Sequence, residues 1–294
     1  MAALADFSGN LAEIVDDRGK GVVQVAARRG RPATGVVWAQ NLVLTANHAV
    51  ENDEGIEVAT GTATVKAIVA GRDPGTDLVL LRADGLAASP LPRRAPAARV
   101  GHLVLALGRP DGVQVTIGIV SALGGSFRSW RGGESEGLIQ STAELLPGFS
   151  GGPLLDAEGQ MVGINSWNYG RGISRALPVE TAETVAKSLI AHGRIRRAYL
   201  GVGSQPLQLA KPAAAQVGQD RGLLVVSVDA AGPAGKAGVM QGDVILALDG
   251  TPVRDLDDLF RALRALEIGS SHTLRVLRAG EERDLAVTAA ERAG

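Results

Sequence analysis

The sequence predicts a mainly β chain of two domains, the second of which is α+β. Its 294 residues are too many for one small domain and comfortable for two. Glycine occurs 39 times, aromatic residues make up only 3%, and short apolar runs separated by glycine or charged turns continue as far as residue 165. Many short strands at close spacing indicate a sandwich or a barrel.

The strands expected in the first domain form two groups. The first group comprises Val22–Ala27, Gly35–Trp38, Leu42–Thr45, Ile56–Ala59, Ala63–Ala70 and Leu78–Arg82. The second group comprises His102–Leu107, Val113–Ser121, Leu138–Ser141, Gly152–Leu155 and Gln160–Asn165. The Pro- and Ala-rich stretch Ala87–Ala98 lies between the groups, so we interpret it as a connector between two β halves, about 20–90 and 98–180.

After Pro178 the apolar residues change to helical spacing, which predicts a helix over 180–192. Gly193 is the expected C-cap of this helix. The first domain is therefore expected to span 1–193, and a short basic linker with Arg194, Arg196 and Arg197 is expected over 194–198.

The second domain is expected to span 199–294. Its predicted strands are Gly222–Val228, Val244–Leu248, Thr273–Arg278 and Arg283–Val287. Asp249-Gly250 is a hairpin-type turn, and Asp255 is the expected N-cap of a helix whose buried face carries leucines. This mixture of strands and one helix predicts an α+β unit.

Composition excludes several function classes. The net charge of −1, without a charged block, gives no electrostatic attraction for nucleic acid or an anionic membrane. The absence of cysteine excludes a thiol nucleophile and a cysteine-ligated metal, and we expect neither metal nor cofactor. No apolar run is long enough to span a bilayer.

Residues 1–17 carry acidic side chains and no Lys or Arg, which is unlike a signal peptide. The sequence leaves the compartment unknown; as it stands, with no signal or anchor, it is compatible with a cytoplasmic protein. The alternative is a periplasmic protein from which a signal peptide has been removed.

Three segments carry residues suited to nucleophilic catalysis: Leu44–Ala49 with His48, Asp73–Leu78 with Asp77, and Pro147–Pro153 with Ser150. A serine hydroxyl needs an adjacent base, and imidazole in turn needs a carboxylate that fixes its tautomer. Gly148 would let the chain bend so that its N–H and that of Ser150 converge on an oxyanion.

Each segment alone is weak, because a lone His, Asp or Ser-Gly-Gly is more often a capping or turn residue. Together, in the order His, Asp, Ser, they predict a chymotrypsin-type triad. The third segment also matches the G-x-S-x-G pattern of α/β-hydrolases, but that pattern requires a following helix, and here a strand and hairpin are expected. The later histidines, His192 and His272, also lack a suitable Asp-bearing loop before them.

These motifs and their surroundings resemble the HtrA/Deg family of serine proteases with PDZ domains, from about Leu11 to Val287. Further matching segments are Gly118–Leu123, Gly148–Leu155, Val162–Asn165, Ala176–Val179, Tyr199–Val202, Lys236–Gly238 and Gly242–Leu246. The resemblance implies a chymotrypsin-like double β-barrel with the triad in its cleft, followed by a PDZ domain. It implies an ATP-independent endopeptidase that acts on unfolded or misfolded protein in quality control.

The resemblance also implies binding partners. The PDZ domain would bind peptide C-termini by β-augmentation, with Tyr199, Leu200, Gly201 and Val202 forming the carboxylate-binding loop; the alternative for this segment is an ordinary glycine-containing turn. A homotrimer or higher oligomer is implied, although Phe7 is the only aromatic residue near the N-terminus. Ile164, Ser166 and Arg175 would lie at the specificity pocket.

The chain departs from the family pattern in four places. Phe149 stands where Asn is usual, Arg109 replaces the Asn of a Gly-Asn-Pro turn, and Gln140–Ala143 reads Gln-Ser-Thr-Ala instead of Gln-Thr-Asp-Ala. Arg175 replaces an aromatic residue: it could favour acidic or polar substrate side chains, or it could be a surface residue without effect on specificity, which we prefer.

Phe149 keeps a second hypothesis open. A bulky ring beside the nucleophile could hold the oxyanion loop in a collapsed state, which would make the chain a catalytically silent, chaperone-like peptide-binding pseudo-protease. A third hypothesis is a protease that idles until a peptide occupies the PDZ domain and shifts the loop population.

Overall fold

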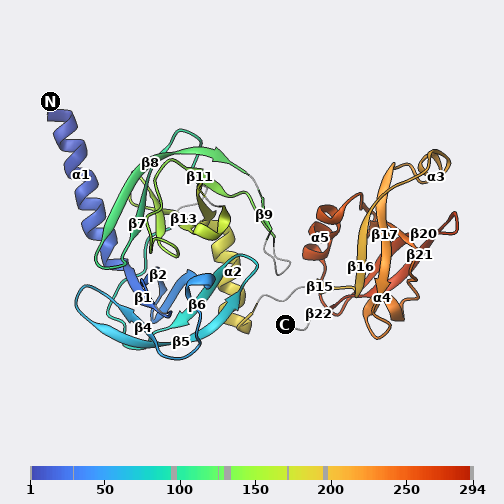
Figure 1. Ribbon diagram of the computed structural model, residues 1–294, viewed down its shortest axis with the longest axis horizontal. Helices are drawn as coiled ribbons and strands as arrows, with labels where there is room; N and C mark the ends of the chain where they lie inside the picture. Colours follow the sequence, from blue (N-terminus) through green and yellow to red (C-terminus); the bar gives the residue numbers. More distant parts are fainter. Residues whose placement is uncertain are drawn as a thin grey trace. The chain divides into compact units, whose positions relative to one another are not determined.

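The computed structural model describes residues 2–28, 30–93, 98–124, 126–128, 134–170, 172–194 and 198–291. The chain divides into two compact units, 1–195 and 196–294, each of which is described by itself (Figure 1). Parts of the predicted connector Ala87–Ala98 and of the predicted linker 194–198, namely positions 94–97 and 195–197, lie outside the described residues.

The first unit begins with a closed antiparallel barrel in the order β1-β2-β3-β6-β5-β4. Its strands are β1 (Val22–Ala26), β2 (Ala33–Ala39), β3 (Leu42–Ala46), β4 (Ile56–Ala59), β5 (Thr64–Asp73) and β6 (Leu78–Arg82). Aliphatic side chains such as Val25, Val43, Val58 and Leu81 fill its interior. The alternation of buried and exposed residues in β4 is the period of two that the sequence shows.

A second closed barrel follows in the order β11-β14-β13-β12-β7-β8. Its strands are β7 (Leu103–Gly108), β8 (Gln114–Leu123), β11 (Ile139–Ser141), β12 (Pro153–Asp156), β13 (Met161–Asn165) and β14 (Ser174–Pro178). Between β8 and β11, β9 (Ser126–Arg128) and β10 (Glu134–Glu136) form a two-stranded sheet. The predicted double barrel is thus confirmed, and β12 leads into a hairpin, not into the helix that an α/β-hydrolase needs.

Helix α2 (Val179–His192) closes the first unit, one residue longer than predicted. Gly193 is its left-handed C-cap, with φ of 69° and its N–H donated to Leu189 O. The buried face of α2 packs on a cluster that includes Leu80 of β6 and Leu177 of β14. The helix therefore stabilises the contact between the two barrels.

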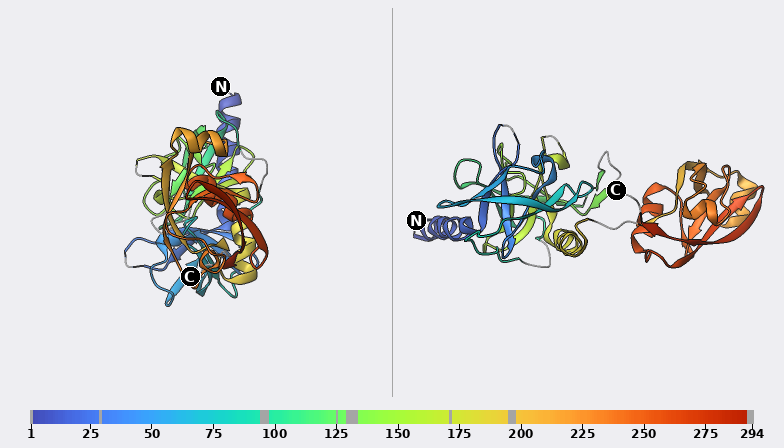
Figure 2. Two further views of the ribbon diagram at one scale, coloured as in Figure 1. Left: turned by 90° about the vertical axis from the view of Figure 1, so that its right-hand side faces the viewer. Right: turned by 90° about the horizontal axis from the view of Figure 1, so that it is seen from below.

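Helix α1 (Ala2–Arg18) was not predicted. Leu11, Ile14 and Val15 pack on the core, and Arg18 Nε donates to Gly159 O at 2.9 Å. The other end of α1 projects from the barrels, with Leu4 74% and Phe7 42% exposed (Figures 1 and 2). Apolar residues recur at helical spacing only in the half of α1 that packs on the core. This periodic stretch is too short to predict a helix from the sequence.

The second unit contains a sheet in the order β16-β17-β18-β20-β21, with β19 paired to β18, and a two-stranded sheet of β15 and β22. Its strands are β15 (Ala198–Tyr199), β16 (Val202–Gln208), β17 (Arg221–Val228), β18 (Val244–Leu248), β19 (Thr251–Pro252), β20 (Ser271–Arg278), β21 (Glu281–Thr288) and β22 (Ala290–Glu291). Its helices are α3 (Lys211–Val217), α4 (Pro233–Lys236) and α5 (Leu256–Ala265).

Local chemistry explains two elements of this unit. Asp249 and Gly250, with φ of 47° and 75°, form the tight β18–β19 hairpin that was predicted. Asp255 caps α5 by accepting a hydrogen bond from Asp258 N–H, also as predicted. Strand β16 lies at one end of the sheet order, so one of its edges is not paired within that sheet.

Candidate active site

Strand pairing brings His48 and Asp77 together. His48 lies in the short 3-10 turn η2 (Asn47–Ala49) directly after β3, and Asp77 directly precedes β6. Because Ala46 pairs with Leu78, the two side chains emerge side by side. His48 Nδ1 lies 2.7 Å from Asp77 Oδ2, and the His48 backbone N–H donates to Asp77 Oδ1 at 2.9 Å.

The Asp77 carboxylate is buried, with 2% of its side chain exposed. It accepts three hydrogen bonds: the two from His48 and one of 2.6 Å from Ser166 Oγ. Such a carboxylate holds one imidazole tautomer and would stabilise an imidazolium. Behind it, Tyr169 donates its hydroxyl to Thr76 O at 2.6 Å. Burial, assisted by the charge of Asp77, raises the Tyr169 pKa well above its ordinary value, so this phenol keeps its proton.

Ser150 lies in the turn before β12 and is 4% exposed. Its Oγ accepts a hydrogen bond of 3.2 Å from the backbone N–H of Trp167. Trp167 begins the 3-10 turn η3 (Trp167–Tyr169), one residue after Ser166. Among the described residues, no hydrogen bond joins Ser150 to His48, so the aspartate–histidine half of the predicted triad is formed while the serine is bonded elsewhere.

The loop before Ser150 bends at Gly148, whose φ is +96°, a value that favours glycine. The Phe149 ring is fully buried in the core of the second barrel, and a Cβ at Gly108 would collide with it. Glycine at 108 therefore makes room for the bulky ring beside the nucleophile. In the described structure, neither Gly148 N–H nor Ser150 N–H donates to a protein acceptor.

The residues expected at the specificity pocket have different environments. Ile164 is buried with the cluster between the barrels, and Ser166 is bonded to Asp77. Arg175 donates from Nη1 to Tyr169 O at 2.7 Å. Its neighbour Ala176 faces the core of the second barrel, so Arg175 lies on the opposite face of β14.

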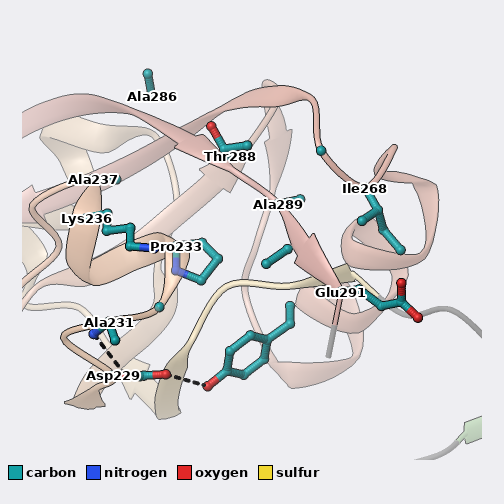
Figure 3. Close-up of a pocket in the computed structure, with 14 residues that line it drawn as sticks. Asp229, Ala231, Pro233, Lys236, Ala237, Ile268, Ala286, Thr288, Ala289 and Glu291 are labelled. Atoms are coloured by element: carbon teal, nitrogen blue, oxygen red, sulfur yellow. Dashed lines mark hydrogen bonds between the residues drawn. The ribbon is translucent and has the colours of Figure 1, made fainter. Parts of the chain in front are cut away.

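In the second unit, the expected carboxylate-binding segment runs from the end of β15 to the start of β16. Leu200 is buried and its carbonyl accepts from Ala234 N–H, while Gly201, at φ of 82°, accepts from Asp229 N–H. A cavity of about 650 Å³ lies nearby, and its lining includes Tyr199 but not the other three residues of the segment (Figure 3). In that cavity the Tyr199 hydroxyl donates to Asp229 Oδ2.

Sequence analysis missed several residues at these sites. Trp167, Tyr169 and Thr34, which bonds the loop around Gly148, have no sequence motif that marks them. The expectation that His272 lacks an aspartate is wrong: its Nδ1 lies 2.7 Å from Asp249 Oδ2. The β18–β20 pairing brings this hairpin residue to His272 across the sheet, which sequence distance conceals.

Two antiparallel barrels with a His-Asp pair and a serine between them, followed by an α+β unit, define the class of trypsin-like serine proteases with a C-terminal PDZ domain. A family model described as a trypsin-like peptidase domain matches residues 33–164, and one described as a PDZ domain matches 198–289. The chain belongs to the HtrA/Deg family.

Probable periplasmic DegP-like serine endoproteases of Pseudomonas fluorescens and Ectopseudomonas mendocina are 35% and 38% identical to it. Each alignment covers 86% of this chain but 54% and 55% of the relatives, so the chain spans about half their length. The solved structure of the HtrA-type protease AlgW with a tripeptide is 31% identical, with a TM-score of 0.78 over 96% of this chain and 97% of that one. A serine endoprotease from Yersinia pestis is 28% identical, with a TM-score of 0.78 over 96% and 98%.

Proposed function

We propose that this chain is an ATP-independent serine endopeptidase in which Ser150 is the nucleophile, His48 the general base and Asp77 the residue that orients His48. The observation that carries the proposal is the buried Asp77 carboxylate, which accepts three hydrogen bonds and is directed at His48 Nδ1. This arrangement leaves His48 Nε2 as the base, because Nδ1 carries the proton donated to Asp77.

In the proposed reaction, Ser150 Oγ leaves the Trp167 N–H and gives its proton to His48 Nε2 as it attacks the peptide carbonyl. The N–H groups of Gly148 and Ser150 would stabilise the oxyanion, and their lack of protein acceptors in the described structure supports this role. His48 then protonates the leaving amine, and water repeats the sequence to release the acyl group. We propose unfolded or misfolded polypeptides as the substrates, since an extended backbone can present its carbonyl to Ser150.

A fluorophosphonate probe and casein test the proposal together. Wild type should be labelled and should cleave casein, and Ser150→Ala should do neither. If the probe labels no assembled form of wild type, the proposed endopeptidase activity is refuted.

The lack of a hydrogen bond between Ser150 and His48 in the described residues favours a second candidate, a catalytically silent protein that binds peptides without cutting them. This candidate predicts equal binding of unfolded casein by wild type and Ser150→Ala, with no cleavage by either. Cleavage that Ser150→Ala abolishes would exclude it.

For the second unit we propose binding of peptide C-termini, either for recruitment or for activation. The edge of β16 that is unpaired in its sheet can accept an added strand, and α5 lies against β16. Tyr199–Val202 leads directly into that strand and is the proposed carboxylate loop. Deletion of residues 199–294 should alter the rate of casein cleavage or its activation by added peptides. If neither changes, the second unit has no role in recruitment or activation.

We also propose assembly into a homotrimer or higher oligomer. Exposed Leu4 and Phe7 on α1 and the outward apolar row of β8, formed by Val115, Ile117 and Ile119, support it, since contiguous exposed apolar surface marks interaction sites. Light scattering measures the molar mass of wild type and of a Leu4→Ser/Phe7→Ser variant in solution. We expect the variant to have the smaller mass, and a monomeric mass for both proteins would overturn the proposal.

A further inference from the structure

Thr34, in β2 of the first barrel, contacts the loop that precedes Ser150 through two different donors. Its Oγ1 donates to Gly148 O at 2.7 Å, and its backbone N–H donates to Ser150 O at 3.2 Å. Thr34 is fully buried, so water does not compete for these bonds. One residue of the first barrel thus holds the carbonyl on each side of Phe149.

The direction of the Thr34 hydroxyl is fixed by a third bond. Its Oγ1 accepts from the backbone N–H of Arg109 at 2.8 Å. A hydroxyl has a single proton to donate, and with the Arg109 amide on one lone pair this proton points at Gly148 O. Arg109 directly follows Gly108, the residue that accommodates the Phe149 ring, so the hydroxyl connects both supports of the loop.

The remaining bonds of the loop show why this hydroxyl matters. Phe149 O accepts from Gly152 N–H, which fixes the Phe149–Ser150 peptide that carries the Ser150 N–H. The Gly148–Phe149 peptide is held at its N–H by Leu146 O and at its oxygen by the Thr34 hydroxyl. Gly148 lacks a Cβ that would restrict its backbone rotation. Its conformation therefore depends on the hydrogen bond from Thr34 more than the conformation of a residue with a Cβ would.

We propose that the Thr34 hydroxyl is a positioning group that holds Gly148 with its N–H available for the oxyanion. This inference rests on the proposed serine protease function. Without the hydroxyl, Gly148 O and Arg109 N–H would be buried without these partners, and the loop would relieve this by rotating about Gly148. Rotation would withdraw an oxyanion donor while leaving His48, Asp77 and Ser150 in place.

The test compares Thr34→Val, which keeps the shape and the backbone N–H, with Thr34→Ser, which keeps the hydroxyl. In the full chain, we expect Thr34→Val to lower kcat for a peptide substrate by about 10- to 100-fold, less than complete loss of an oxyanion donor. KM should stay within about twofold, because the hydroxyl is needed in the transition state and not for ground-state binding. Thr34→Ser should retain kcat within about threefold, because it restores the bond.

Thr45→Val is the matched control, since Thr45 is equally buried and its hydroxyl also donates to a backbone carbonyl, that of Thr34. Its kcat should fall by less than about threefold. An equal fall in Thr45→Val and Thr34→Val would overturn the inference, as would unchanged kcat in Thr34→Val. If Thr34→Val does not fold, Thr34→Ser becomes the test, because it keeps the hydroxyl. A tenfold loss of kcat in folded Thr34→Ser would then overturn the inference. An inactive wild type that no fluorophosphonate labels would refute the proposed function itself, which is a different outcome.

Discussion

Two aspartate–histidine pairs in this chain share an Nδ1–Oδ2 distance of 2.7 Å but differ in which of the two side chains is exposed. In the first unit, the Asp77 side chain is 2% exposed and that of His48 is 30% exposed. In the second unit the exposure is reversed: Asp249 is 45% exposed and His272 11%. In the first pair the carboxylate is sequestered and the base is accessible, as a catalytic base requires.

Each pair also has a serine nearby, with its hydroxyl used differently. Ser270 Oγ lies 2.9 Å from His272 Nε2 and donates to Glu267 O at 2.7 Å, while Nε2 also contacts Glu267 O at 3.1 Å. Among the described residues, Ser150 Oγ only accepts, from Trp167 N–H, and keeps its proton for a base. Hydrogen bonds that link Ser, His and Asp are therefore not sufficient evidence of an active site, because the Ser270 proton is donated to the Glu267 carbonyl.

Removing the two serine hydroxyls should give the largest contrast. Ser150→Ala should lower kcat by about a million-fold if Ser150 is the nucleophile, whereas Ser270→Ala should leave kcat within about twofold. The measurement is initial-rate hydrolysis of a fluorogenic peptide by the full chain. Comparable losses of kcat in both variants would show that Ser150 and Ser270 do not differ in catalytic role.

The two aspartates should differ by somewhat less. Asp77→Asn should lower kcat by about 10,000-fold, because the amide imposes the wrong imidazole tautomer. Asp249→Asn should change kcat by less than about twofold, since it alters only a hydrogen-bonded turn of the second unit. Steady-state kinetics of both variants provide the check, with circular dichroism to verify that each is folded.

The smallest effect concerns pH and only the second pair. Partial burial lowers the pKa of His272, but hydrogen bonds to the Glu267 carbonyl and the Asp249 carboxylate outweigh it, so the pKa lies above its ordinary value. A raised pKa means that the charged form stabilises the fold: this stability is complete below the unfolded pKa of about 6.5 and is lost as pH rises through the folded pKa.

NMR titration of the His272 ring and urea unfolding of the second unit at pH 5.5 and 8.5 measure this effect. We expect lower stability at pH 8.5 in wild type and a flatter pH dependence in His272→Gln. An identical pH dependence in the two proteins would show that the pair does not contribute.

Sequence pattern was sufficient for most of the fold. The six strands of the first barrel and five of the six in the second follow from short apolar runs separated by turns, whereas β14 was not predicted as a strand. The helix that ends at Gly193 follows from the helical spacing of its apolar residues and from glycine at a left-handed position. Helix α1 was missed because much of it is exposed, and α3 because it is short and contains no fully buried residue. In the described part of the chain, no helix combines the length and apolarity that a membrane crossing requires.

By itself the sequence determined which residues could do chemistry: His48, Asp77 and Ser150 occur in segments whose order and residue types identify a family. Tertiary structure alone decided how they are held. Thr34, Trp167 and Tyr169 bond to the site from distant strands and turns, and Asp249 meets His272 across a sheet. The reason is physical: residue identity fixes chemical capacity, whereas hydrogen bonds between distant segments depend on strand register and packing, which leave no local pattern in the chain.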